Sequence, residues 1–206
     1  MLNQRHTRYT KLKKSDERQF RSPRRADPYR ADSKPAGVNQ CPHCHSVNIR
    51  GKWLSERQAG LEIAKMRKLL PFGVYEPLLQ LNCPACLQQR DHYAQGVVEI
   101  RGTHWRERAI QVFETLAKTE LISRVRNDQE RILWTNDTHQ NTKIYVTLPE
   151  LARQMGRILQ RSFKGKTHYI RSTEEPFLRV VWDSDGEVIY SHPLGRGRAR
   201  GRKAIA

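Results

Sequence analysis

The sequence predicts an α+β protein with two folded parts between two basic ends, and three observations support this. Four cysteines form two C-x-x-C pairs separated by 38 residues. Strand-like and helical patterns alternate through residues 94–185. The 206-residue chain has a net charge of +17, with 11 Lys/Arg against four Asp/Glu in residues 1–40 and five Lys/Arg without any acid in 194–206. The middle of the chain is therefore close to balanced.

The cysteine pairs read CPHC and CPAC, and three chemistries use a C-x-x-C motif. A c-type haem needs C-x-x-C-H and export, but only the first pair is followed by a histidine, His45. A disulfide oxidoreductase needs its motif between a buried strand and a helix, whereas CPHC follows the linker-like SKPAGVNQ. Neither accounts for a second pair. Zinc accounts for both, because two tight turns present four thiolates to one tetrahedral ion.

We therefore predict one structural Zn²⁺, since a shell of four sulfurs leaves no open position for a substrate. The expected ligands are Cys41, Cys44, Cys83 and Cys86. Three nearby histidines either replace a sulfur or face solvent or phosphate: His43, His45 and His92.

A helical insert is predicted between the cysteine pairs, in SERQAGLEIAKMRKLL. Its apolar side chains recur at helical spacing, and Pro71 and Gly73 end the pattern. The apolar face consists of Ala59, Ile63, Met66 and Leu70. The other side is basic and either contacts solvent or faces RNA; it carries Arg57, Lys65, Arg67 and Lys68.

After the second pair, alternating β-branched residues predict strands. They lie at 94–102, 130–135, 142–147, 168–171 and 178–182. A helix capped by Thr103 follows the first strand and runs to about Lys118. A second helix starts at a capping box formed by Thr147 and Glu150, with an apolar face of Leu151, Met155, Ile158 and Leu159. The order β-α-β-β-α-β plus one strand predicts a ferredoxin-like domain, with helices on one face of the sheet.

The segments CPHCHSVNIRGKW and CPACLQQRDHYAQGVVEIRG resemble an uncharacterised bacterial zinc-ribbon family. That family is in turn similar to the zinc-binding N-terminal part of the large-ribosomal-subunit export adaptor of archaea and eukaryotes. The resemblance covers about 41–183 and is most specific after the second pair, at Asp91, Tyr93, Gly96 and Arg101-Gly102. The family usually has glycine where this chain has His45, and its insert is shorter. The resemblance implies the same four cysteine ligands and a connection to the ribosome or RNA.

The predicted organisation has four parts: a disordered basic arm at 1–38, a Cys₄ zinc ribbon with its helical insert at 39–93, the ferredoxin-like domain at 94–185 and an Arg/Gly-rich tail at 186–206. The basic ends bury too little apolar surface to fold alone, but arginine pairs with phosphate and stacks on bases. The predicted nucleic-acid contacts are Arg21, Arg24, Arg25, Arg30, Lys65, Arg67, Lys68, Arg196, Arg198, Arg200, Arg202 and Lys203.

These patterns predict a zinc-stabilised RNA-binding protein that associates with the ribosome or ribosomal RNA, with ribosomal proteins as further partners. A DNA-binding transcription regulator, and a protein-interaction adaptor with solubilising ends, are the alternatives. The sequence has no P-loop, G-x-S-x-G, H-E-x-x-H or dinucleotide motif, so we expect neither catalysis nor a small-molecule substrate. It has no apolar run of about 18 residues and no signal-like segment, which predicts a cytoplasmic location away from membranes.

Overall fold

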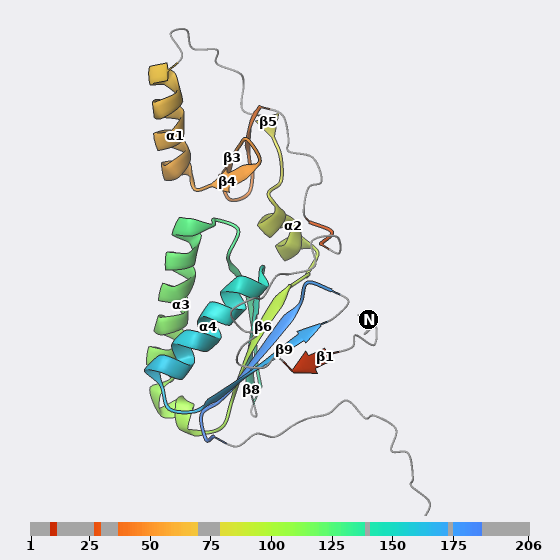
Figure 1. The fold of residues 1–206 in the computed structure, drawn as a ribbon, viewed down its shortest axis with the longest axis vertical. Helices are drawn as coiled ribbons and strands as arrows, with labels where there is room; N and C mark the ends of the chain where they lie inside the picture. Colours follow the sequence, from red (N-terminus) through yellow and green to blue (C-terminus); the bar gives the residue numbers. More distant parts are fainter. Residues whose placement is uncertain are drawn as a thin grey trace, which may run out of the picture.

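The computed structural model describes residues 9–11, 27–29, 37–69, 79–138, 141–172 and 175–186. Within these ranges the chain is α+β, with two mixed sheets and four α-helices. A small sheet with helix α1 lies at one end of an elongated molecule, and a larger sheet with α3 and α4 lies at the other (Figure 1). Among the described residues, no helix combines the length and the apolar composition needed to cross a bilayer.

The small sheet is built from very short strands in the order β4-β3-β2-β5. Their bounds are β2 Val38–Gln40, β3 Val47–Ile49, β4 Lys52–Leu54 and β5 Leu79–Gln80. Helix α1, Glu56–Leu69, packs Ala59, Ile63 and Met66 against Val47, Ile49 and Leu54. The predicted insert helix and its apolar face are present, apart from Leu70, which lies outside the described residues.

The large sheet has the order β1-β9-β10-β6-β8-β7. Its strands are β1 Tyr9–Lys11, β6 Gly96–Arg101, β7 Ile132–Asp137, β8 Asn141–Val146, β9 Lys166–Ser172 and β10 Leu178–Asp183. Helices α3, Ala109–Arg126, and α4, Pro149–Ser162, cover one face (Figure 1). The core between them contains Val98, Ile100, Leu116, Leu151, Met155, Leu159 and Trp182.

The strands and helices follow the predicted order, but a ferredoxin-like sheet is not confirmed. In a simple split βαβ sheet, the strand after the second helix lies antiparallel beside the first strand. Here the last strand, β10, lies between β9 and β6 and pairs parallel with β6, with Val180 opposite Val98. β9 and β10 pair antiparallel, and the inward side chains of β10 fill the core under α4. The extra strand is therefore central to the sheet.

Two short segments of the N-terminal region are also ordered against the body. β1 pairs antiparallel with β9, with Tyr9 opposite Ser172. The ring of Tyr29 lies 5.1 Å from that of Tyr93, and its hydroxyl donates to Asp91 at 2.9 Å. At these places the structure differs from the predicted disorder of residues 1–38, most of which lie outside the described residues.

Neither of the two predicted side-chain caps is formed at the start of its helix. The side chain of Thr103 makes no capping bond; the carboxylate of Asp185 accepts the backbone N–H groups of Thr103 at 2.8 Å and His104 at 3.1 Å. These donors hold the pKa of Asp185 well below its usual range. Asp185 therefore caps the start of a short 3₁₀ helix, His104–Arg108. Helix α3 follows directly and ends at Arg126, beyond the predicted end at Lys118.

The second cap is Leu148, followed by Pro149 at the first helical position. The hydroxyl of Thr147 instead accepts the Arg131 N–H at 2.8 Å and donates to the Gln129 carbonyl at 2.6 Å. The predicted capping box with Glu150 is therefore not formed, because Thr147 connects α4 to the loop before β7.

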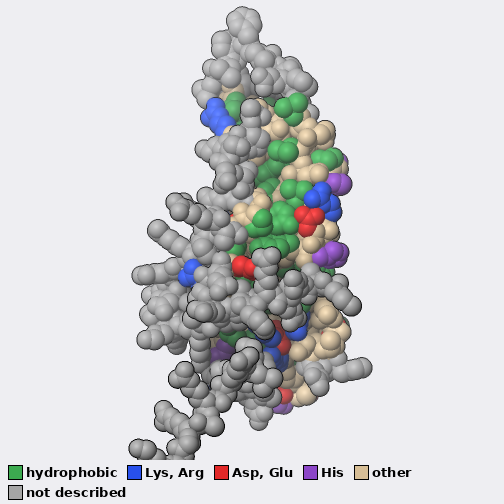
Figure 2. Space-filling model, turned by 90° about the vertical axis from the view of Figure 1, so that its right-hand side faces the viewer, with side chains coloured by type: hydrophobic (Ala, Val, Ile, Leu, Met, Phe, Trp, Pro, Cys, Tyr) green, Lys and Arg blue, Asp and Glu red, His purple; other side chains and the backbone are tan. Residues whose placement is uncertain are grey.

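The sheet face away from the helices contains a buried carboxylate. Glu99 lies between the inward-facing Val98 and Ile100, so it points to the opposite face, yet it is 1% exposed. It accepts hydrogen bonds from Arg101 Nε at 2.7 Å and Arg179 Nε at 3.0 Å. Burial alone would raise the pKa of Glu99, but the two guanidinium groups outweigh burial and lower it. Figure 2 views the molecule from this side and shows a band of hydrophobic side chains flanked by charged and histidine side chains.

Helix α4 packs closely on β10 at Gly156, so a substitution there tests this packing. A Cβ at Gly156 would lie 2.5 Å from Val180 Cγ1 and 3.1 Å from the Tyr169 hydroxyl oxygen. We expect Gly156→Ala to lower the free energy of unfolding by about 1–3 kcal/mol through overpacking, measured by urea denaturation.

The matched control is Gly60→Ala in α1, where an added Cβ meets nothing within 4 Å. Because alanine is the better helix former, this change should raise the free energy of unfolding by about 0.5–1 kcal/mol. Equal gains from both substitutions would contradict the close packing of α4 on β10.

Candidate metal centre

Each cysteine pair sits in a tight turn whose backbone hydrogen bonds hold both sulfurs on one side. In the first turn, between β2 and β3, Cys41 N donates to the Ser46 carbonyl at 2.8 Å and His45 N donates to the Cys41 carbonyl at 3.0 Å. In the second turn, Cys83 is the N-cap of α2, Pro84–Arg90, and its sulfur accepts the Cys86 N–H at 3.4 Å. The proline after Cys83 occupies the first helical position, where it costs no hydrogen bond.

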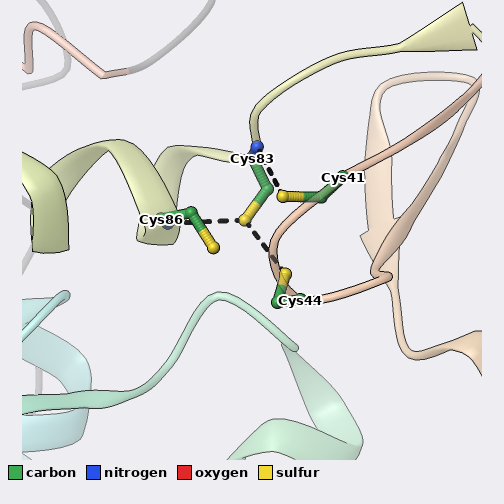
Figure 3. Close-up of side chains that lie close together, drawn as sticks. All are labelled: Cys41, Cys44, Cys83 and Cys86. Carbon is green, nitrogen blue, oxygen red and sulfur yellow. Dashed lines mark hydrogen bonds between the residues drawn. The ribbon is translucent and has the colours of Figure 1, made fainter.

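The two turns bring the four predicted ligands together (Figure 3). Their sulfur atoms all lie within 4.8 Å of one another, and Cys44 Sγ is 3.5 Å from Cys83 Sγ. A tetrahedral ion with Zn–S bonds of about 2.3 Å requires sulfur atoms about 3.8 Å apart. Cys41 and Cys83 are fully buried. The spacing, burial and ligand chemistry therefore fit a single soft divalent ion.

The acidities of the crowded thiols show why this arrangement suits a cation. The pKa of Cys44 is lowered to about 3, because the Cys83 thiol and the Ser46 backbone N–H donate hydrogen bonds to its sulfur. The pKa of Cys86 is raised to about 12 by burial and by its hydrogen bond to Cys44. The pKa of Cys83 is also raised, because it donates to Cys44. A divalent cation stabilises the thiolate form of all four residues, which is the form that binds metal.

The loop between α3 and β7 places an arginine beside the sulfurs. Ser46 Oγ lies 3.1 Å from Cys44 Sγ and donates to Asp128. Arg131 Nη2 donates to Ser46 Oγ at 2.7 Å and to Asp128 Oδ2 at 2.6 Å. Burial would lower the pKa of Arg131, but Cys44 and Asp128 raise it above its usual value. Arg131 thus offsets part of the negative charge of a four-thiolate site from just outside the ligand shell.

Further polar contacts join the cysteine turns and α1 to the rest of the protein. Ala85 N donates to Gln129 Oε1 at 3.0 Å, next to the second cysteine pair. Gln58 Nε2 of α1 donates to the Val125 carbonyl, near the end of α3, at 2.7 Å. The candidate site is therefore part of the junction between the small sheet and the large one.

The structure groups all four predicted cysteines, and none of the three histidines belongs to that cluster of described residues. His92 instead lies edge-on to Trp134, with ring centroids 5.4 Å apart. His43 and His45 are exposed. His45 has φ 60°, in the left-handed region that favours glycine.

Most of the residues predicted to contact nucleic acid lie outside the part of the chain that the structure describes. Lys65 is exposed on α1 and pairs with Glu62 at 3.0 Å. Arg67 and Lys68 belong to α1, but their side chains fall outside the description. The others lie outside the described residues: Arg21, Arg24, Arg25, Arg30, Arg196, Arg198, Arg200, Arg202 and Lys203.

Sequence reasoning missed two features, one beside the cysteines and one on the large sheet. One is the Arg131–Asp128 pair, which precedes β7 in an ordinary polar turn and carries no motif. The other is an aromatic stack of Trp134 and Tyr145, with ring centroids 4.9 Å apart. The alternation TKIYVT could have placed Tyr145 on the face opposite the buried Ile144. Trp134 follows a register shift in β7, which no local pattern indicates.

No family model, curated protein or solved structure matches this chain. The resemblance to the zinc-ribbon family therefore stays a prediction, and the site is argued from its own geometry.

The cluster generates a prediction about metal content. We expect reduced protein to bind one Zn²⁺ per chain through four thiolates, and its Co²⁺ form to show sulfur-to-metal charge-transfer absorption in the near ultraviolet. Cys83→Ser should abolish stoichiometric binding in elemental analysis, while His43→Ala leaves it unchanged. A metal content well below one per chain, or one unaffected by Cys83→Ser, would argue against the site.

The buried junction generates a second prediction. Asp128→Ala leaves Arg131 without its carboxylate, and both side chains are largely buried, at 3% and 14% exposure. Because an uncompensated buried charge is costly, we expect the free energy of unfolding to fall by about 3 kcal/mol in zinc-saturated protein. Glu62→Ala is the control, since the exposed Glu62–Lys65 pair contributes at most about 0.5 kcal/mol. Equal effects of the two substitutions would contradict a structural role for Asp128.

Proposed function

We propose that this chain is a structural-zinc RNA-binding protein that associates with the ribosome or ribosomal RNA. The first support is the metal centre. Its ligands are four cysteine sulfurs, two of them fully buried, so the ion has no coordination position for a substrate. Zinc is the proposed ion, because it prefers tetrahedral thiolate shells and has no redox chemistry of its own. Its role is to hold the fold together, without catalysis.

The observation that carries the proposal is the distribution of charge. Of the 38 Lys/Arg residues, 11 lie in residues 1–40 and five in 194–206, where only four acidic residues occur. The intervening residues carry 22 Lys/Arg against 17 Asp/Glu. Cationic segments on either side of a nearly neutral body favour a polyanionic partner. Arginine dominates both ends, and it combines phosphate pairing with base stacking.

The zinc-ribbon end of the described body also offers cations. The turn between β3 and β4 exposes Arg50, and the exposed Lys52 follows as the first residue of β4. A hydrogen bond from Gly51 N to Asn48 Oδ1 at 3.0 Å holds the turn. Exposed Arg57 and Lys65 follow on α1. These side chains could extend an RNA contact that starts on the basic ends.

RNA of the ribosome is proposed over other polyanions because of the family resemblance, which also supports ribosomal proteins as further partners. The proposed cytoplasmic location rests on the lack of a signal-like or long apolar segment in the sequence. Ribosomal RNA presents single-stranded loops and exposed phosphates. These features suit Arg-rich segments that become ordered when they bind. Preferential binding of duplex DNA, or of a protein partner without RNA, would contradict this choice.

Salt dependence tests the contribution of the basic ends. If six or more cations meet phosphates, affinity for a labelled ribosomal RNA fragment should fall by roughly 10³-fold or more between about 50 and 200 mM salt. Replacing Arg196, Arg198, Arg200 and Arg202 by Gln should reduce the slope of log affinity against log salt. Lys164→Gln, an exposed cation between α4 and β9, is the control and should leave it unchanged.

Competition and sedimentation test the choice of RNA. Unlabelled duplex DNA should compete poorly with ribosomal RNA for the full chain, and the protein should sediment with ribosomal subunits after free RNA is digested. A flat salt profile would exclude the basic ends as the main contact. Equal competition by duplex DNA would contradict RNA as the preferred partner.

A further inference from the structure

Helix α3 is apolar on two sides, and only one of them meets the core. Val112 and Leu116 are buried against the large sheet and α4. Five large apolar side chains of the same helix are exposed: Ile110 at 76%, Phe113 at 39%, Leu121 at 65%, Ile122 at 58% and Val125 at 64%. No other described helix exposes more than one large apolar side chain.

Four of these side chains, together with Ala117, line one side of the helix, which we call the α3 stripe: Ile110, Phe113, Ala117, Leu121 and Val125. At about 100° per residue they fall within an arc of about 120° along nearly the whole helix, which also contains the charged Glu114 and Arg124. Helix α3 lies at the outer edge of the molecule, with α4 beside it (Figure 1). The exposed apolar area is on the order of 500 Å², comparable to the largest apolar patch of a typical monomer, and such a patch is often functional.

The α3 stripe is nearly symmetric about its middle. Phe113 lies four residues before Ala117 and Leu121 four residues after it. Ile110 and Val125 lie seven and eight residues away on the two sides. A two-fold axis at Ala117 would place Phe113 of one copy beside Leu121 of the second, and Ile110 beside Val125. The small side chain at the crossing point lets the two helices approach closely.

The charges beside the stripe favour the same arrangement. Glu114 and Lys118 lie on the same side of Ala117, one turn apart, and within one chain their charged atoms are 4.0 Å apart. In an antiparallel pair, Glu114 of one copy lies beside Lys118 of the second, and the reciprocal contact follows from symmetry. A parallel pair would instead place like charges opposite each other. Shape and charge both point to the stripe itself as its complement.

We propose that this protein forms a two-fold symmetric homodimer through antiparallel packing of the α3 stripe. A contact of about 500 Å² per copy is below the roughly 800 Å² of a standard stable interface. The dimer is therefore weak, with dissociation in the micromolar range, and forms in a concentration-dependent way. The proposal does not depend on RNA binding, because the stripe is apolar and lies on a helix outside the metal centre.

Sedimentation velocity of the zinc-loaded, nuclease-treated full chain tests the dimer. The wild type should shift from monomer to dimer across the micromolar range and keep this behaviour at high salt, which excludes bridging by nucleic acid. Leu121→Glu and Ile110→Glu should each weaken dimerisation at least tenfold without lowering the melting temperature, because both side chains are already exposed. Leu79→Glu is the matched control, since Leu79 is 57% exposed on β5, and should leave dimerisation unchanged.

A charge swap tests the antiparallel register directly. Glu114→Lys and Lys118→Glu should each weaken self-association, because each variant places like charges across the two-fold axis. A mixture of the two should form a heterodimer at least as stable as the wild-type dimer, since both cross-axis pairs then have opposite charges. A chain that stays monomeric through the micromolar range, a dimer unaffected by Leu121→Glu, or a mixture that does not associate would each overturn the proposal.

Discussion

Four sulfur atoms from two turns, 38 residues apart in the chain, meet within 4.8 Å, and the small sheet beside them depends on that meeting. Its strands are only two or three residues long, and its apolar cluster has four buried members. Such a small sheet buries too little apolar surface to be stable alone. A cross-link through one tetrahedral ion would supply what the core cannot, because metal binding to a site absent from the unfolded chain adds directly to folding stability.

The polar contacts beside the four cysteines also orient the small sheet relative to the large sheet. Arg131 and Asp128 come from the loop before β7, yet they reach Ser46 in the first cysteine turn. A four-thiolate site with a divalent ion carries excess negative charge, and a nearby guanidinium compensates for it in a region of low dielectric. The junction is thus polar and directional, with hydrogen bonds from Ala85 and Gln58 on either side. Directional contacts of this kind favour one docking geometry over many.

The body differs from a simple split βαβ sheet in ways that affect its surfaces. β10 fills the place beside β6 and carries Arg179, which joins Arg101 in neutralising the buried Glu99. β1 extends the sheet beyond β9 and brings a short piece of the basic N-terminal region to its edge. Helix α3 has one apolar side in the core and another in solvent. The body thus offers a sheet face with paired charges and aromatic rings, and a helix face that is mostly apolar.

The sequence by itself determined the features that depend on local spacing. Two C-x-x-C pairs identified the four cysteines that the structure brings together, because a tight turn places both sulfurs on one side whatever lies between the pairs. Helical periodicity identified α1 and α4, and alternation identified strands such as β6 and β8, because these periods follow from backbone geometry. Tertiary structure alone decided the position of β10 beside β6, the capping of the helix start by Asp185, and the place of Arg131 near Cys44. Asp185 lies 82 residues from Thr103, and Arg131 lies 85 residues from Ser46. Contacts between such distant residues depend on how the elements pack, as does the choice of which apolar side of α3 enters the core, and no local period encodes that packing.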